Sequence, residues 1–171
     1  MIQLCCTQKL RQEWHIKPRD LAEPKENLSP LGNWYAHLFT LDRRKTIIFV
    51  NEKTLASFII FGVKKDDPDK LAQAFLLGVA QVLLLLGVTK NKIAQILTDY
   101  QQVEFSKTSD RRLLGVLNDL VRHYKAHVKQ RGGLKYSDLD EIIYQANALP
   151  QRTIRYLSTI DYLHQIIEDI T

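Results

Sequence analysis

The sequence has few of the residues that support small cross-linked or low-complexity chains. Its 171 residues include 2 cysteines, 5 prolines and 7 glycines. Cys5 and Cys6 are adjacent, and a disulfide between neighbours would need a strained ring, so we expect no structural disulfide and a reducing, cytoplasmic setting. The scarcity of proline and glycine excludes a collagen-like or low-complexity protein. The length suits one globular domain. The hydrophobic content of 45% is ordinary for a protein with a packed core.

The recognised motifs of catalysis and cofactor binding are also missing. The chain has no G-x-S-x-G, no glycine-rich phosphate loop, no paired C-x-x-C and no H-E-x-x-H. We therefore expect no cofactor. We also expect a binding protein rather than an enzyme. Asp119, His123 and His127 are spaced four apart, but the outer two would lie about 12 Å apart along a helix, too far to share one metal ion. No metal site is predicted.

One long stretch carries no charge. Leu71 to Val88 reaches the lower limit of length for a membrane span. However, Gln73 and Gln81 would lie in hydrocarbon, and the stretch lies between a helix-start signal at Asp67-Pro68-Asp69 and a stop signal at Gly87. We therefore expect a buried central helix and no membrane partner.

The first part of the chain favours strands. Residues 1–33 indicate a short strand and an irregular arm. Trp34 to Leu41 and Thr46 to Asn51 are rich in aromatic and β-branched residues and flank a polar four-residue connection, Asp42 to Lys45, which predicts a hairpin. Leu55 to Val63 either extends the sheet or begins a helix capped by Thr54 or Ser57, and we favour a helix or a mixed segment.

From Asp67 onward the apolar spacing is helical, apart from a short segment at Val103 to Lys107 that is suited to a strand. We predict an α+β fold in which a small antiparallel sheet near the N-terminus packs against a helical C-terminal two thirds. The chain is predicted to be a single domain, 1–171, with mainly strands and loops in 1–66 and mainly helices in 67–171. The predicted helices are Asp67 to Leu86, Thr89 to Gln101, Asp110 to about Arg131, one starting at Ser137 or Asp138, and Thr153 to Ile170.

The formal net charge of +5 is unevenly distributed. Residues 1–51 carry 8 basic and 5 acidic side chains, and residues 103–136 carry 8 and 3. Residues 137–171 carry 2 basic and 6 acidic side chains. The basic character therefore lies in the predicted hairpin and the long helix, whereas the last helices are acidic.

The long helix is predicted to carry a row of polar and basic side chains opposite its apolar face. At 100° per residue, this row shares one face and extends for about 27 Å. It can follow a phosphate backbone or meet an acidic partner, and the simpler alternative is a solvated face. Arg112 and Asp119 fall on a second face, where a polar contact of Asp119 with Arg112 or His123 is the simplest interpretation. The row consists of Arg111, Asn118, Arg122, Lys125 and Lys129.

The hairpin connection is the second basic cluster. Arg43 and Arg44 carry guanidinium groups that can bind phosphate or carboxylate oxygens, and Lys45 adds an ammonium group. Strand alternation is expected to direct Arg44 to the side opposite Arg43 and Lys45, so only part of the cluster can face one ligand. Alternatively the turn is merely solvated, with Asp42 accepting backbone hydrogen bonds.

Five short motifs resemble a family of small bacterial and archaeal proteins classed as a domain of unknown function. The resemblance covers about residues 30 to 125. It implies that the hairpin turn and the start of the long helix are positions that such proteins emphasise, and it implies no activity. The motifs are Trp34-x-Ala36-x-Leu38, Asp42-Arg43-Arg44-Lys45, Phe49-x-Asn51, Thr54-x-x-Ser57 and Leu114-Gly115-x-x-Asn118-Asp119-Leu120.

Three functional hypotheses follow. The first is a protein that binds nucleic acid or a phosphorylated ligand, and it requires the turn and the helix row to lie on one surface. The second is a protein-interaction component of a toxin–antitoxin or phage-defence type, and the third is an enzyme acting on phosphodiesters or nucleotides through Asp42, Asp119 and a histidine. For the first hypothesis, the predicted binding residues are Arg43, Arg44, Lys45, Arg111, Arg112, Asn118, Arg122, Lys125 and Lys129, with polar support from Asp42, Asn51 and Asp119.

Overall fold

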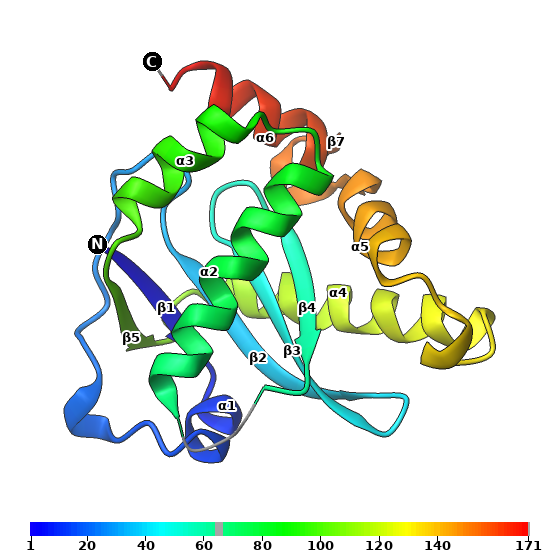
Figure 1. Ribbon diagram of the computed structural model, residues 1–171, viewed down its shortest axis with the longest axis horizontal. Coiled ribbons are helices and arrows are strands. Elements are labelled where there is room, and N and C mark those ends of the chain that lie inside the picture. Colours follow the sequence, from blue (N-terminus) through cyan, green and yellow to red (C-terminus); the bar gives the residue numbers. More distant parts are fainter. Residues whose placement is uncertain (64–66, 171) are drawn as a thin grey trace.

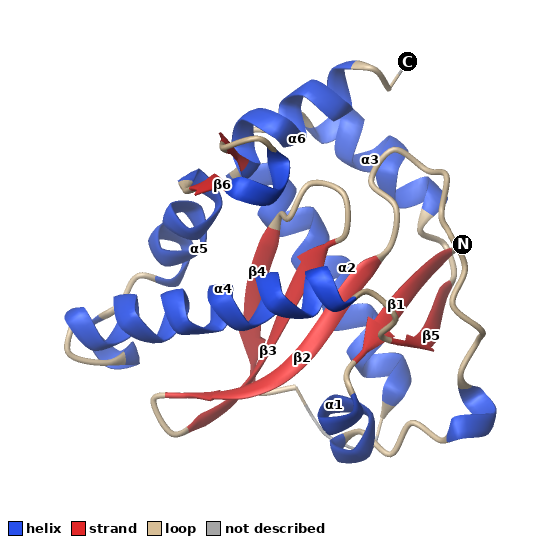
Figure 2. Ribbon diagram, turned by 180° about the vertical axis from the view of Figure 1, so that it is seen from behind, coloured by secondary structure: helices blue, strands red, loops and turns tan. Residues whose placement is uncertain are grey.

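A five-stranded sheet with a helix on each face forms the centre of the protein. The structure, a computed structural model, describes residues 1–63 and 67–170. Helix α2 crosses one face of the sheet (Figure 1), and α4 crosses the other (Figure 2). The strands are β1 (Ile2–Cys6), β2 (Trp34–Leu41), β3 (Arg44–Asn51), β4 (Ser57–Phe61) and β5 (Val103–Lys107). The helices are α1 (Gln8–Glu13), α2 (Pro68–Leu85), α3 (Lys90–Asp99), α4 (Arg111–Gln130), α5 (Leu139–Ala148) and α6 (Thr159–Glu168).

The α+β class is confirmed, and the sheet is mixed. Its order is β4-β3-β2-β1-β5. Strands β2 and β3 pair antiparallel, as the predicted hairpin requires, and β4 pairs antiparallel with β3. The sheet is not wholly antiparallel, however, because β1 lies parallel to both β2 and β5. These pairings join segments far apart in the sequence, and parallel neighbours need long connections that leave no turn signal between them.

The prediction of a helix or mixed segment at Leu55 to Val63 was wrong, because Ser57–Phe61 forms β4. The side-chain oxygen of Asn51 accepts hydrogen bonds from the backbone N–H and the hydroxyl of Thr54, each at 2.9 Å. Asn51 thus closes a turn between β3 and β4, and Thr54 helps to form that turn instead of capping a helix. Phe58 then stacks on Phe49 across the ladder at 4.8 Å between ring centroids, which favours the strand.

The outer edge of β4 is capped by a side chain from α5. Asn147 accepts a hydrogen bond from the backbone N–H of Ser57 at 2.9 Å and donates one to its carbonyl at 2.9 Å. Its amide group therefore pairs with Ser57 as a neighbouring strand would. Asn147 is completely buried, so the cap removes one outward-facing backbone pair from the sheet edge.

Trp34 is at the centre of the core on the α2 face. Its ring contacts Phe58 and Phe75 edge-on, with centroids 5.7 Å apart in both pairs. Its indole N–H donates to the hydroxyl of Tyr100 at 3.1 Å. Gly78 of α2 lies so close to Phe58 that a Cβ there would be 2.1 Å from the ring. The described core is continuous across the predicted division at residue 66.

Helix α2 is buried on its inner side only. A third of its residues are buried, while Leu77 and Leu84 are 65% and 53% exposed. The expectation of a buried central helix therefore holds for one face. Among the described residues, α2 is the one helix whose length and apolar composition would allow it to cross a membrane. Cys5 and Cys6 are both free and buried.

The last predicted helix begins later than expected. It starts at Thr159 rather than Thr153, because the short strands β6 (Pro150–Gln151) and β7 (Leu157–Ser158) form a hairpin before it. Arg155 and Tyr156 adopt left-handed backbone conformations in this hairpin, with φ of 58° and 61°. Non-glycine residues rarely do so, and the residue types give no sign of this turn.

Candidate functional site

The basic hairpin is tighter than the sequence indicated. Strands β2 and β3 run up to Leu41 and from Arg44, so the connection is the two-residue turn Asp42-Arg43 rather than four residues. Both turn residues have positive φ, 45° and 66°, as two-residue turns with the right twist for a hairpin require. Arg44 and Lys45 belong to β3, where they pair with Leu41 and Thr40.

Asp42 connects this turn to the end of α4. Its Oδ2 accepts a hydrogen bond from the backbone N–H of Leu134 at 2.8 Å. A Cβ at Gly133, where φ is 117°, would be 2.9 Å from the same oxygen. The glycine therefore permits the close approach of the two segments. The hairpin and the C-terminal end of α4 therefore lie side by side, which brings the turn close to one end of the helix row.

A cavity of about 400 Å³ lies between the hairpin and α4. The ammonium group of Lys125 also lies over the Phe39 ring, 6.0 Å from its centroid, which fixes the direction of this side chain towards β2. Two of the predicted cations thus line one recess. The lining residues are Thr40, Leu41, Asp42, Lys125, Val128, Lys129, Gly132 and Gly133.

Two further residues, Lys9 and His37, lie beside this cavity, and of these Lys9 adds a positive charge. Burial, followed by the positive charges of Lys9 and Lys125, lowers the pKa of His37. Its Nδ1 forms a hydrogen bond with the hydroxyl of Thr7 at 3.0 Å. Sequence reasoning did not include Lys9 or His37 among the predicted binding residues. The parallel pairing of β1 and β2 brings α1 here, and no local pattern indicates that pairing.

The other hairpin cations lie apart from the cavity. Arg44 stacks over Phe61, with its guanidinium carbon 5.4 Å from the ring centroid. Lys45 forms an ion pair with Glu13 of α1. Adjacent strand residues point to opposite faces, so these two cations do not face the same ligand. Arg43, in the turn itself, is exposed.

Along α4, the side chains of the predicted row are exposed, and one of them, Arg122, forms an ion pair. Arg111, Asn118, Lys125 and Lys129 are exposed. Arg122 is also exposed and lies 3.2 Å from Asp119 in an ion pair, which leaves its charge only weakly neutralised in water. Arg111 lies at the opposite end of the helix from the hairpin contact.

Two of the predicted supporting or binding residues, Arg112 and Asn51, have other contacts. Arg112 lies 3.5 Å from the carboxylate of Asp110, the N-cap of α4, so the suggested contact between Arg112 and Asp119 is wrong. Asn51 is completely buried in the β3–β4 turn and donates to the carbonyl of Leu31 at 2.7 Å. It supports the fold away from the hairpin tip. Asp42 lines the cavity and Asp119 does not. Their arrangement therefore does not support the enzyme hypothesis.

His123 and His127 lie against one another on α4, with ring centroids 4.1 Å apart. The Nε2 atom of His123 is buried without a hydrogen-bond partner. Across residues 1–63 and 67–170, no group of three or more histidine, cysteine or acidic side chains is arranged to hold a metal ion.

The lowered pKa values of His37 and His123 predict that the protein loses stability in acid. Burial lowers the pKa of both His37 and His123 below the ordinary value of 6.5. The charges of Lys9 and Lys125 lower the pKa of His37 further, and His127 lowers that of His123 further. Between the ordinary and the lowered pKa, the unfolded chain binds more protons than the folded one, so stability falls as pH drops below 6.5. We expect the urea midpoint to fall from pH 7 to pH 5, and less steeply in a His37→Gln, His123→Gln variant. Equal slopes for the two proteins would contradict this.

A family model described as Domain of unknown function (DUF6933) matches residues 3–162. The chain belongs to the DUF6933 family. The match extends well beyond the resemblance at about residues 30 to 125, and it includes α1, the hairpin and α4 of this DUF6933 protein. A search of curated proteins found no match.

Proposed function

We propose that this DUF6933 protein binds nucleic acid by contacting the phosphate backbone of the nucleic acid. The observation that supports the proposal is that the hairpin lies against the C-terminal part of α4, with Lys125 and Lys129 lining the cavity between them. We call this the α4–hairpin surface, and it consists of Lys9, His37, Arg43, Lys125 and Lys129 around the cavity described above.

The balance of charge favours an anion on this surface. The C-terminal end of a helix carries about half a negative charge, which opposes an anion near Lys129. Three lysines and Arg43 outweigh that partial charge. Among the described residues that line the cavity, the one carboxylate is that of Asp42, which accepts a hydrogen bond from the backbone N–H of Leu134.

A polymer fits this layout better than a small phosphorylated ligand. Lys125 and Lys129 line the cavity, but Arg122 and Arg111 continue outward along the exposed face of α4. A small ligand would neutralise the cations at the cavity and leave the rest of the row unpaired. Successive phosphates of one strand can contact cations over the whole row of about 27 Å.

The salt dependence of affinity tests the proposal. We expect a fluorescently labelled single-stranded oligonucleotide to bind with a slope of log K against log salt of about −2 to −4, as the release of counterions from three to five phosphates requires. Fluorescence anisotropy measures it, with a duplex of the same sequence and pyrophosphate as competitors. A slope near zero would overturn the proposal. Competition by pyrophosphate as strong as by the oligonucleotide, per phosphate, would indicate a small ligand instead.

A further inference from the structure

An exposed tyrosine lies beside the α4–hairpin surface. Tyr136 belongs to the short helical turn Leu134–Tyr136, in the loop that joins α4 to α5. A Cβ at Gly132 would be 3.5 Å from Cδ2 of its ring, and Gly132 lines the cavity between the hairpin and α4. Figures 1 and 2 show this loop and the tip of the hairpin at the same end of the molecule. The ring of Tyr136 therefore lies at the margin of the cavity.

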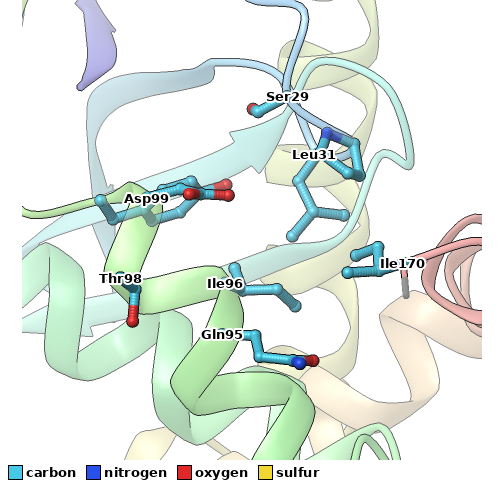
Figure 3. A pocket seen from close by; sticks show the side chains of 9 residues that line it. Ser29, Leu31, Gln95, Ile96, Thr98, Asp99 and Ile170 are labelled. Atoms are coloured by element: carbon cyan, nitrogen blue, oxygen red, sulfur yellow. The ribbon is translucent and has the colours of Figure 1, made fainter.

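The environment of Tyr136 differs from that of a tyrosine in the core. The recess at the C-terminal end of α3, whose wall includes Leu31 and Ile96 (Figure 3), is also lined by Tyr100. Tyr100 is 2% exposed, and its hydroxyl accepts a hydrogen bond from Trp34. Tyr136, in contrast, is 69% exposed. Its ring adds little to the core, and much of its aromatic surface is open to a ligand.

Hydrogen bonds hold the backbone on both sides of this ring. The carbonyl of Gly133 accepts from the backbone N–H of Tyr136 at 3.1 Å and from the hydroxyl of Ser137 at 2.8 Å. The N–H of Leu134 donates to Asp42 of the hairpin turn at 2.8 Å. Tyrosine has only two side-chain torsions, so a tyrosine ring on a fixed backbone loses little entropy when it binds a ligand.

The charges around the ring suit a neutral group that is joined to phosphates. The ammonium group of Lys135 lies over the ring, 5.6 Å from its centroid, and Lys129 lines the adjacent cavity. Two residues after Tyr136, however, the acidic start of α5 begins with Asp138 and Asp140. A phosphate placed on the ring would lie close to these carboxylates. A nucleic-acid base is uncharged at neutral pH and avoids that repulsion.

We propose that Tyr136 stacks on a base of a single-stranded nucleic acid, an inference that rests on the function proposed above. The phosphates of the strand contact the α4–hairpin surface, and one base lies flat on the ring. Aromatic side chains stack on all four bases, because every base has a π-face. In a duplex these faces are covered by the neighbouring base pairs, so Tyr136 favours a single strand over a duplex.

An oligonucleotide without bases separates the contribution of the ring from that of the phosphates. The probes are a fluorescently labelled single-stranded oligothymidylate and an abasic oligomer of the same length, which carries the same phosphates. We expect the Tyr136→Ala variant to bind oligothymidylate about tenfold more weakly than the unmodified protein, as the loss of one stacked base implies. Both proteins should bind the abasic oligomer equally. Fluorescence anisotropy measures all four affinities.

Two further variants provide controls. Tyr136→Phe keeps the ring and should bind oligothymidylate as the unmodified protein does. Tyr156 is also 69% exposed but belongs to the hairpin of β6 and β7, so Tyr156→Ala should leave the affinity unchanged. The slope of log K against log salt should be the same for Tyr136→Ala as for the unmodified protein, because no phosphate contact is removed. Circular dichroism verifies that each variant is folded.

The results that would overturn the stacking differ from those that would overturn the proposed function. If the unmodified protein and Tyr136→Ala bound oligothymidylate equally, with a steep salt slope, the stacking would be wrong and the phosphate contacts would stand. Equal losses of Tyr136→Ala on both oligomers, or a loss in Tyr136→Phe as large as in Tyr136→Ala, would also contradict stacking on a base. A salt slope near zero for the unmodified protein would overturn both proposals.

Discussion

Reversing the charge of both cavity lysines, Lys125→Glu with Lys129→Glu, is expected to weaken nucleic-acid binding about 100-fold at low salt. Each reversal removes one phosphate contact and adds a repulsive charge, and about tenfold per site is the size of effect that one such contact carries. Both side chains are exposed on α4, so the variant should retain its helix content. Fluorescence anisotropy gives the affinity and circular dichroism the fold.

The matched control changes the net charge by the same amount on a different helix. Lys90 and Lys92 belong to α3, which packs against α2 rather than α4. The Lys90→Glu, Lys92→Glu variant should bind within about threefold of the unmodified protein, since distant charges are screened at physiological salt. Equal losses in both double variants would show that net charge alone drives binding, without a defined surface.

The Asn147→Ala variant is expected to lose about 3 kcal/mol of unfolding free energy, because two backbone groups of Ser57 would be left buried without partners. Asn147 bonds to both Ser57 groups at 2.9 Å and also donates to the carbonyl of Ile143 at 2.7 Å. No other described side chain caps this part of the edge. Urea denaturation followed by circular dichroism measures the change.

A nearby position on the same helix provides the control for that loss. Gln145 forms a hydrogen bond with Glu141 at the surface, and Gln145→Ala should change the stability by no more than about 0.5 kcal/mol. If Asn147→Ala cost as little as Gln145→Ala, Asn147 would not be the cap that maintains the β4 edge.

The elements that the sequence predicted well are those with strong local signals. The long helix was expected from Asp110 to about Arg131 and runs over Arg111–Gln130. Its N-cap is Asp110, however, whose carboxylate accepts from the N–H groups of Arg112 and Leu113. The strand at Val103–Lys107 matches its predicted bounds. Periodicity and β-branched content fix such elements locally.

Long-range pairing explains where the prediction of the fold was incomplete. The parallel position of β1 between β2 and β5 depends on burial across the whole sheet. Likewise, β4 forms because Phe58 contacts Phe49 and Asn147 caps Ser57. Neither interaction is visible within the segment itself, where the apolar spacing suits a helix as well as a strand.

The same distinction applies to the candidate site. The helix row was predicted from the 100° spacing of its residues, and Lys125 and Lys129 line the cavity. The sequence could not show that Lys45 pairs with Glu13, or that Lys9 lies beside His37. Tertiary contacts decide which cations remain available to a ligand. Nor could it show that Asp42 holds the hairpin against the loop after α4.

The central claim is that Lys125 and Lys129 contact phosphates, and comparing two salt slopes tests it most directly. Affinity for one single-stranded oligonucleotide is measured across a range of salt concentrations for the unmodified protein and for the Lys125→Glu, Lys129→Glu variant. The slope of log K against log salt should be shallower by about 1.4 in the variant, as the loss of two phosphate contacts requires. Parallel lines for the two proteins would contradict the claim.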